Sequence, residues 1–530
     1  MTRSALFRSL AGALGAVSLV AACGGGGGTP SENLAADQTL RFAIIDQPTS
    51  LDPAHVDSAV DITFLSEVFT GLYKFDNNLK IIADGAQAMP EVSPDGKTWT
   101  FHIRQGVTFQ DGTPLNAQAV KFSLDRLIDP RTFKAQPAIL GGKTGIDHTD
   151  VIDDTHVRVT LKTRLAPFVA AMTGTNAAII SPASVTVAPN KPEVITQPVG
   201  TGPYKFKERV ASDHITLVAN KDYWGSKPNY DTQVIKVVPE AASREALVKS
   251  GGVDVINLPP ANDIPALQTD SSVKVILGPS DRTIQIVIDN QDQTQPLLQK
   301  AEVRQALNYA VDKDTIIKKV MFGAALPLDA PMARTLFGYC SVGSYPYNPG
   351  KAKSLLQSAG ATGMSVKLVS PTGRYVQDIQ VASAVAGYLR EAGLKVDGPA
   401  TTDWPTYVPT YVLTPPAQAK TDLHLLGWAP AYLDAQQQFE QFYSPRIPPG
   451  GQASAGYSNP QVDTLVEKAN SGTDPAQRQK DYCSAARTVW NDAPWIFLYN
   501  QKYPLVTSSR VSGVTGLPNE KFVTTWASPA

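Results

Sequence analysis

The sequence predicts an α/β protein with more than one domain, and three observations support that class. Short apolar stretches with the two-residue period of strands alternate with amphipathic helices, and short loops connect them. This alternation is typical of an α/β lobe with a largely parallel sheet. The chain has 530 residues, more than one ordinary core accommodates, so two or three domains are expected. A hydrophobic content of 42% and a charged content of 18% describe a folded globular protein.

The overall charge narrows the classes of partner. Lys and Arg together number 47, and Asp and Glu number 48, which gives a formal net charge of −1. A nearly neutral chain offers neither a polyanion-binding surface nor a polybasic membrane patch. We therefore expect no nucleic acid among its partners.

The N-terminus has the features of a secretion signal. Two arginines precede an apolar run at residues 10–22, which predicts a signal peptide over residues 1–22. The run ends in LVAAC, which resembles a bacterial lipobox with Cys23 as the diacylated first residue of the mature chain. Glycines follow, and residues 23–39 are predicted to be a flexible tether. We expect a bacterial extracytoplasmic protein, on the periplasmic or cell-surface side, anchored to a membrane by Cys23. The alternative is an ordinary cleaved signal with an incidental cysteine.

The first part of the folded chain gives several elements in order. Residues 39–46 are predicted to form a buried strand, and apolar residues at helical spacing predict a helix over residues 62–69. Between residues 98 and 103 apolar and polar residues alternate, which predicts a strand with one buried face. A turn follows, and Asn116 is placed to cap a helix over residues 117–127.

The rest of the chain continues the alternation. Further strands are predicted at residues 157–161, 283–289, 366–369, 423–428 and 495–499. Further helices are predicted at residues 303–312, 349–360 and 376–389, and after the capping residues Asn459 and Asp474. In open α/β sheets ligands bind where strands end at their carboxyl side. The loop at residues 429–435 is therefore a candidate ligand site.

One stretch carries a specific motif. Residues 99–114 read WTFHIRQGVTFQDGTP, with aromatic residues, an arginine and an Asp-Gly turn at fixed spacing. This pattern closely resembles the signature of the family 5 extracellular solute-binding proteins, the peptide- and nickel-type binding subunits of ABC importers. GTGPY at residues 200–204 and VRQALNYAVDKDTI at residues 303–316 resemble further segments of that family. The resemblance covers residues 40–503.

The resemblance implies a fold and a mechanism. The fold is of the periplasmic-binding-protein type II-like, large three-domain class, with two lobes and a hinge near Arg282 and Asn500. Domain Ia combines residues 40–73, 200–282 and 500–530, domain Ib covers 74–199, and domain II covers 283–499. A protein of this family captures a peptide or peptide-like solute by closing its lobes and delivers it to the permease subunits of an ABC importer. We expect a monomer without a cofactor.

No motif supports an enzyme. The six histidines have no H-E-x-x-H or comparable metal-ligand spacing, and no G-x-S-x-G nucleophile motif occurs. GGKT at residues 141–144 ends like a P-loop, but Pro137 occupies the position of the first glycine. We expect no catalytic residue and no metal site. A secreted hydrolase or a surface receptor is the alternative from another class.

The resemblance also points to ligand contacts. Peptide-binding relatives read W-x-x-D-Y-x-D-P after the Gly-Trp strand, and their first Asp pairs with the α-ammonium of the peptide. Here Trp428, Tyr432 and Asp434 match, whereas Ala431 replaces the amine-pairing Asp. Either Asp57 or Asp434 substitutes, or the ligand is a blocked peptide or a non-peptide solute such as a metal chelate, haem or an oligosaccharide. The predicted ligand-binding residues are Asp57, Asn257, Trp404, Gly427, Trp428, Ala429, Ala431, Tyr432, Asp434 and Tyr499.

Core packing is the alternative for each of the aromatic residues in this set.

The two remaining cysteines allow two interpretations. An oxidising compartment permits a disulfide between Cys340 and Cys483, and two free buried thiols are the alternative.

Overall fold

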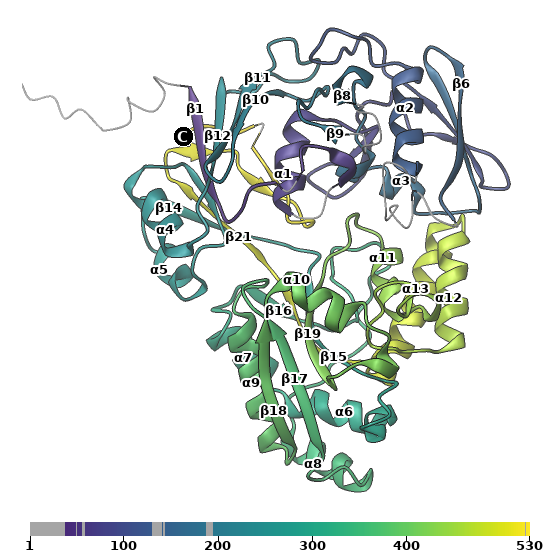
Figure 1. Cartoon of the computed structure of the whole chain (residues 1–530), viewed down its shortest axis with the longest axis vertical. Coiled ribbons are helices and arrows are strands. Elements are labelled where there is room, and N and C mark those ends of the chain that lie inside the picture. The colour runs from purple at the N-terminus through teal and green to yellow at the C-terminus, as the bar shows by residue number, and fades with distance from the viewer. Residues whose placement is uncertain are drawn as a thin grey trace, which may run out of the picture.

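The computed structural model describes residues 38–48, 50–55, 59–129, 140, 144–186, 194–524 and 526–530. The predicted signal peptide, Cys23 and Asp57 lie outside the described residues, as does the predicted tether up to residue 37. The described chain forms two lobes, one above the other in Figure 1. Among the described residues no helix combines the length and the apolar character that a membrane span requires.

The upper lobe contains a seven-stranded mixed sheet in the order β10-β11-β12-β1-β13-β21-β14. Its strands are β1 (Thr39–Ile44), β10 (Tyr204–Val210), β11 (His214–Ala219), β12 (Thr232–Val237), β13 (Val255–Asn257), β14 (Val273–Gly278) and β21 (Tyr503–Ser508). Strand β1 is parallel to β12 and β13, and the other pairs are antiparallel. The helices of this part are α1 (Ala59–Val68), α4 (Ala241–Ser250) and α5 (Ile264–Leu267).

The upper lobe also contains a four-stranded antiparallel sheet, with β4 (Glu91–Val92), β5 (Thr98–His102), β7 (His156–Leu161) and β6 (Ile146–Asp153) in that order. Trp99 and Phe101 of β5 are buried, as the alternation predicts. Helices α2 (Ala117–Ile128) and α3 (Phe168–Ala171) contribute to the same core. Asn116 caps α2, because its side chain accepts a hydrogen bond from the backbone N of Ala119 at 3.1 Å.

Short strand pairs add to the upper lobe. They are β2 (Tyr73–Phe75) with β3 (Ile81–Ala83), β8 (Val185–Thr186) with β9 (Val194–Ile195), β22 (Val511–Ser512) with β25 (Ser528–Pro529), and β23 (Thr515–Gly516) with β24 (Phe522–Val523). The turn that connects β23 to β24 contains Glu520.

The lower lobe is built on a six-stranded sheet in the order β16-β20-β15-β19-β17-β18. Its strands are β15 (Thr283–Ile288), β16 (Ala325–Pro327), β17 (Ser365–Pro371), β18 (Lys395–Thr402), β19 (Leu423–Trp428) and β20 (Trp495–Gln501). Its helices are α6 (Ala301–Ala310), α7 (Lys313–Lys319), α8 (Pro349–Ser358), α9 (Asp378–Glu391), α10 (Trp404–Tyr407), α11 (Ala435–Phe439), α12 (Pro460–Ser471) and α13 (Pro475–Asp492).

The prediction of a largely parallel sheet is wrong for this lobe. Strand β17 is parallel to β18 and β19, but β15 is antiparallel to β19 and β20, and β16 is antiparallel to β20. The chain enters the lower lobe along β15 and leaves it along β20, so these neighbouring strands necessarily run in opposite directions. The class is a mixed α/β fold.

The two connections between the lobes lie side by side. The side chain of Asn500 donates hydrogen bonds to the backbone carbonyls of Ser280 and Arg282, both at 2.8 Å. The backbone N of Gln501 also donates to the carbonyl of Arg282, at 2.9 Å. Away from these connections the lobes touch again, because the backbone N of Ala166 donates to the carbonyl of Asn470 of α12 at 2.7 Å.

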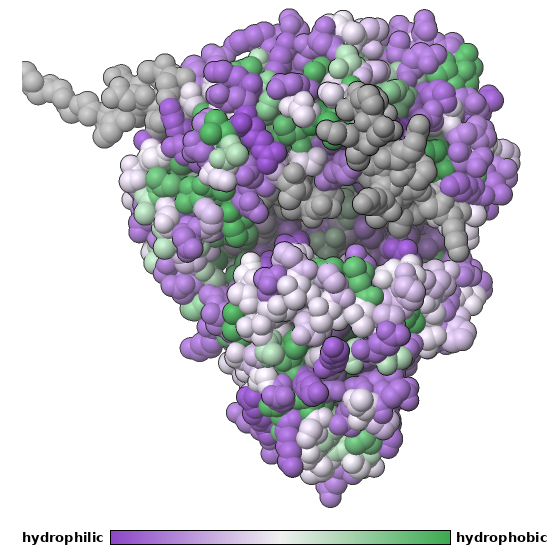
Figure 2. Space-filling view, in the orientation of Figure 1, coloured by the Kyte–Doolittle hydropathy of each residue, from purple (hydrophilic) through white to green (hydrophobic). Residues whose placement is uncertain are grey.

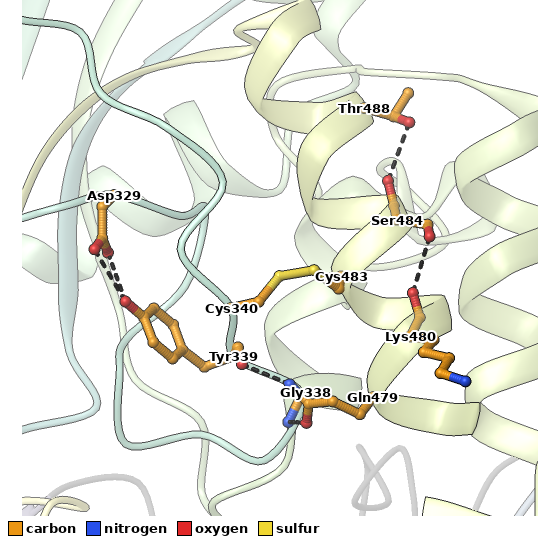
Figure 3. The surroundings of a disulfide bond; sticks show 9 residues. All are labelled: Asp329, Gly338, Tyr339, Cys340, Gln479, Lys480, Cys483, Ser484 and Thr488. Carbon is orange, nitrogen blue, oxygen red and sulfur yellow. Dashed lines mark hydrogen bonds between the residues drawn. A yellow bond between two sulfur atoms is a disulfide. The ribbon is translucent and has the colours of Figure 1, made fainter. Parts of the chain in front are cut away.

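A disulfide joins Cys340, in the segment before α8, to Cys483 of α13, with the two Cα atoms 5.7 Å apart (Figure 3). The side chain of Gln479 lies on the preceding turn of α13. It donates to the carbonyl of Tyr339 at 2.6 Å and accepts from the backbone N of Gly338 at 3.1 Å. The disulfide and these two hydrogen bonds fix the same segment to α13.

Candidate ligand-binding site

A cavity of about 270 Å³ lies where the lobes meet. The space-filling view shows the surface hollowed along this boundary (Figure 2). The lower lobe supplies most of the lining, and the upper lobe supplies Ile62, Asn519 and Glu520. The remaining lining residues are Arg282, Arg374, Tyr375, Trp404, Val408, Val412, Leu426, Gly427, Trp428, Ala429, Pro430, Ala431 and Gln452.

A larger hollow of about 550 Å³ lies elsewhere, on the upper lobe. Residues of the upper lobe alone line it, among them Asp52 and Arg209. The Asp52 carboxylate is paired with Arg126, and Arg209 donates to the side chain of Gln47 and the carbonyl of Pro48. These two charged groups are thus committed within the protein. We take the other cavity as the candidate site because residues of both lobes line it.

Arg374 is the most available charge in the cavity. It lies between the end of β17 and the start of α9, and its backbone N donates to the Asp378 carboxylate at 2.8 Å. Its guanidinium carbon lies 4.9 Å from the ring centroid of Trp404 and 5.4 Å from that of Tyr375. The Nε atom is buried and has no hydrogen-bond partner among the described residues. Burial, together with the nearby charge of Arg282, lowers the pKa of Arg374.

Arg282 is committed to a partner within the protein. Its Nε and Nη2 atoms donate to the two carboxylate oxygens of Glu520 at 2.5 and 2.6 Å, and the side chains are 11% and 7% exposed. Burial lowers the pKa of Arg282, but the charge and hydrogen bonds of Glu520 outweigh it and raise that pKa overall. The neighbouring Asp281 is fully buried, and burial with the charge of Glu520 raises its pKa well above the usual range. Arg282 therefore has fewer guanidinium N–H groups available to bind a ligand than Arg374 has.

The loop after β19 forms one wall of the cavity and reaches the upper lobe. The indole Nε1 of Trp428 donates to the carbonyl of Gln437 at 3.2 Å, and the backbone N of Ala431 donates to the side-chain oxygen of Gln437 at 2.6 Å. Tyr432 is 4% exposed and packs in the core that contains Trp99 and Phe101 of the upper lobe. The loop thus contacts both lobes.

Asp434 is fully occupied inside the lower lobe. It is buried, and one carboxylate oxygen accepts from Nη2 of Arg478 at 2.8 Å. The other oxygen accepts from the hydroxyl of Tyr482 at 3.2 Å and from the backbone N of Gln436 at 3.0 Å, which caps α11. The cavity lining does not include this carboxylate, so it is not placed to pair with a ligand amine in the cavity.

The structure places the predicted residues in three groups. Trp404, Gly427, Trp428, Ala429 and Ala431 line the cavity. Four residues lie in the packed interior outside the lining: Asn257, Tyr432, Asp434 and Tyr499. The side chain of Asn257 donates to the hydroxyl of Tyr503 at 3.1 Å, and Tyr499 belongs to the core of the lower lobe. Asp57 lies outside the described residues.

Sequence reasoning missed all the charged residues of the lining and several polar ones, among them Arg282, Arg374, Tyr375, Asn519 and Glu520. Arg374 follows the end of β17, so the rule that placed ligands at strand ends could have found it. Glu520 lies in the C-terminal segment, where no sequence signal pointed to the cavity. Among the described residues no group of His, Cys, Asp and Glu side chains could hold a metal ion.

Residues 80–448 match the family described as "Bacterial extracellular solute-binding proteins, family 5 Middle". The chain belongs to this family. It is an extracytoplasmic substrate-binding protein of the peptide and nickel type of ABC transporter, and proteins of this family bind solutes without converting them. The resemblance predicted from the motif at residues 99–114 is confirmed.

Individual proteins resemble the chain over nearly its whole length. The glutathione-binding protein GsiB of Pectobacterium atrosepticum is 30% identical over 479 residues, which cover 89% of this chain and 91% of the relative. The structure of DppA from Helicobacter pylori in complex with the peptide STSA gives a TM-score of 0.75 at 24% identity, over 91% of this chain and 97% of that one. AgaA from A. tumefaciens R10 in complex with agropinic acid gives 0.73 at 25% identity, over 92% and 96%. The predicted periplasmic-binding-protein fold is confirmed.

Proposed function

We propose that this solute-binding protein captures a short peptide or peptide-like solute with a free carboxylate between its lobes and delivers it to the permease of an ABC importer. The observation that carries the proposal is the guanidinium of Arg374, which lies in the cavity beside the rings of Trp404 and Tyr375 without an ion-pair partner among the described residues. A guanidinium binds a carboxylate through two parallel hydrogen bonds, and a half-buried position strengthens them.

The size and walls of the cavity favour a small ligand. Its volume of about 270 Å³ lies near the lower end for small-molecule sites, which suits a dipeptide or tripeptide better than a long peptide. Trp404, Trp428 and Tyr375 offer apolar surface with polar tips, which tolerates varied side chains.

The relatives support a carboxylated ligand. GsiB is named as a glutathione-binding protein, the DppA structure is a complex with the peptide STSA, and the AgaA structure is a complex with agropinic acid. Peptides and organic acids share the carboxylate that Arg374 would bind. A non-peptide acid or a chelate carrying carboxylates is the second candidate, because Ala431 stands where peptide-binding relatives place an amine-pairing Asp.

The remaining parts of the proposal concern how the protein works. Domain Ia would combine residues 40–73, 200–282 and 500–530, with residues 74–199 as domain Ib and residues 283–499 as domain II. The paired connections at Arg282 and Asn500 would be the hinge about which a monomer closes. Acylation of Cys23 would hold the protein at the membrane, beside the permease.

Thermal unfolding in the presence of candidate solutes tests this function. The probes are glutathione, dialanine, dialanine amide and maltotriose, each added to the purified protein. A ligand that binds only the folded state stabilises it by about 2.7 kcal/mol at a hundredfold excess over Kd. We expect glutathione or dialanine to raise Tm and the amide and the sugar to leave it unchanged. A shift with maltotriose alone would contradict the proposal.

A further inference from the structure

We propose that Glu520 and Asn519 together bind the ammonium group of the ligand. This rests on the proposed function, which places the carboxylate of a short peptide on Arg374. Both residues line the same cavity as Arg374, but they come from the C-terminal segment of the upper lobe. A zwitterionic ligand would therefore bind to the lower lobe through its carboxylate and to the upper lobe through its amine.

Glu520 supplies the negative charge. It is the only carboxylate among the described residues that line the cavity. Asp434 lies outside the lining and is paired with Arg478. Its two oxygens accept the hydrogen bonds of Arg282, and an ionised carboxylate has about four acceptor positions. One of these oxygens also accepts from the hydroxyl of Ser280 at 3.5 Å, so about one acceptor position remains for a further donor.

Asn519 supplies an independent observation. Its side-chain oxygen is buried and has no hydrogen-bond partner among the described residues. Buried polar groups in native proteins nearly always have a partner, so an unpaired acceptor in a cavity wall indicates a missing donor. An ammonium carries three N–H donors, enough for the Asn519 oxygen and the Glu520 carboxylate together.

The backbone of Glu520 is held in a conformation that is unfavourable for a residue with a side chain. Glu520 adopts φ 61, in the left-handed region that a residue with a side chain rarely occupies. A turn fixes it there, since the backbone N of Glu520 donates to the carbonyl of Leu517 at 3.1 Å and that of Leu517 donates to the carbonyl of Lys521 at 2.6 Å. Such conformations persist where the surrounding structure requires them, and they concentrate at ligand sites.

A double-mutant cycle between the protein and the ligand tests the proposal. The probes are S-methyl glutathione and its N-acetyl derivative, which lacks the ammonium, and their Kd values are measured by calorimetry. For the natural protein we expect acetylation to weaken binding at least about tenfold. In the Glu520→Gln variant the free amine should no longer strengthen binding, so the Kd values of the two probes should differ less than about threefold.

Further variants keep the test decisive if Glu520→Gln fails to fold. Asn519→Ala removes only the unpaired acceptor and should also reduce the effect of acetylation. Ala431→Asp places a carboxylate on another wall of the cavity and should restore the preference for the free amine when combined with Glu520→Gln. Glu440→Gln is the matched control, because Glu440 pairs with Arg446 outside the lining and should not alter the preference.

The outcomes separate the two proposals. If the natural protein binds both probes equally, peptide capture stands and the ammonium site at Glu520 is wrong. If acetylation has the same effect in the natural protein and in both variants, the two side chains do not bind the amine. If neither probe binds, the same comparison is made with dialanine and its N-acetyl derivative. If those do not bind either, the proposed function fails, and this inference fails with it.

Discussion

Asp434 accepts a hydrogen bond at 2.8 Å from Nη2 of Arg478, and both side chains are buried. This ion pair joins the loop after β19 to α13. It also removes the one acidic side chain of residues 428–434 from the set that could bind an amine. Asp434, one of three residues that match the family motif, therefore stabilises the lower lobe and lies outside the cavity lining.

Asp434→Asn should destabilise the protein strongly, because it leaves Arg478 charged, buried and unpaired. Breaking one side of a buried ion pair costs about 3 to 5 kcal/mol in free energy of unfolding, which urea denaturation measures. Asp125→Asn is the control, since its partner Lys121 is exposed and such pairs contribute at most about 1 kcal/mol. Equal effects of the two substitutions would contradict the structural role of Asp434.

Arg374→Gln should weaken the binding of a carboxylated peptide by about 10- to 100-fold, because hydrogen bonds to charged groups contribute about 1.5 to 3 kcal/mol. Calorimetry with glutathione measures the loss. The control is Arg390→Gln in α9, whose guanidinium donates to the carbonyls of Val396 and Gly398 outside the cavity lining. An unchanged Kd in Arg374→Gln would remove the main support for a carboxylate site.

Gly427→Ala should distort the cavity wall. A Cβ atom at this position would lie 2.5 Å from Cε1 of Tyr375 and 2.7 Å from Cδ1 of Ile284, so the tyrosine beside Arg374 must move. Overpacking of this kind costs about 1 to 3 kcal/mol, and we expect peptide affinity to fall together with Tm.

Gly387→Ala provides the comparison for that substitution. Gly387 lies within α9, and an added Cβ would meet no atom within 4 Å. Alanine should therefore stabilise this helix by about 0.5 to 1 kcal/mol without changing affinity. If Gly427→Ala behaves in the same way, close packing against Tyr375 does not control the site.

Reduction of the disulfide should lower Tm. The bond between Cys340 and Cys483 spans 143 residues, and loss of a native disulfide typically costs about 2 to 5 kcal/mol. Scanning calorimetry with and without dithiothreitol measures the shift. The variant with both cysteines replaced by Ser should melt near the reduced protein and should not respond to dithiothreitol. A response in that variant would show that reduction acts elsewhere.

The lower lobe should lose stability as pH rises. Burial raises the pKa of Asp289 to about 7. Burial also raises the pKa of Asp422 to about 7, together with the hydrogen bond that its protonated carboxyl donates to the Asp292 carboxylate. An unfolded Asp titrates near pKa 3.9, so the folded state retains these protons between about pH 4 and 7. Stability from these groups is fully present below about pH 4 and is lost as pH rises through about 7.

Asp422→Asn tests this dependence. Its side chain keeps an oxygen that can accept from the backbone N of Lys367, and it no longer needs a proton. The difference in free energy of unfolding between the variant and the natural protein should shift in favour of the variant by about 2 to 4 kcal/mol as pH rises from 4 to 8. Urea unfolding across that range measures the difference. A difference that does not change with pH would show that Asp422 is ionised in the folded protein.

Much of the local structure could be predicted from the sequence. The alternation at Trp99 and Phe101, the cap at Asn116 and the caps at Asn459 and Asp474 all depend on residues within a few positions of one another. The family motif is also a local pattern. Such signals are complete within a short stretch of chain, so they identified the strands, the helices and the kind of protein.

The tertiary structure alone decided which side chains bind and which only hold the fold. Asp434 and Arg478 are 44 residues apart, and Arg282 and Glu520 are 238 apart. No short stretch records such pairings, because they depend on how the lobes fold back on each other. The same long-range arrangement set the antiparallel direction of β15 and β20. The sequence by itself determined a solute-binding protein of known family; the packing of distant segments decided that Arg374 is available in the cavity while Asp434 is not.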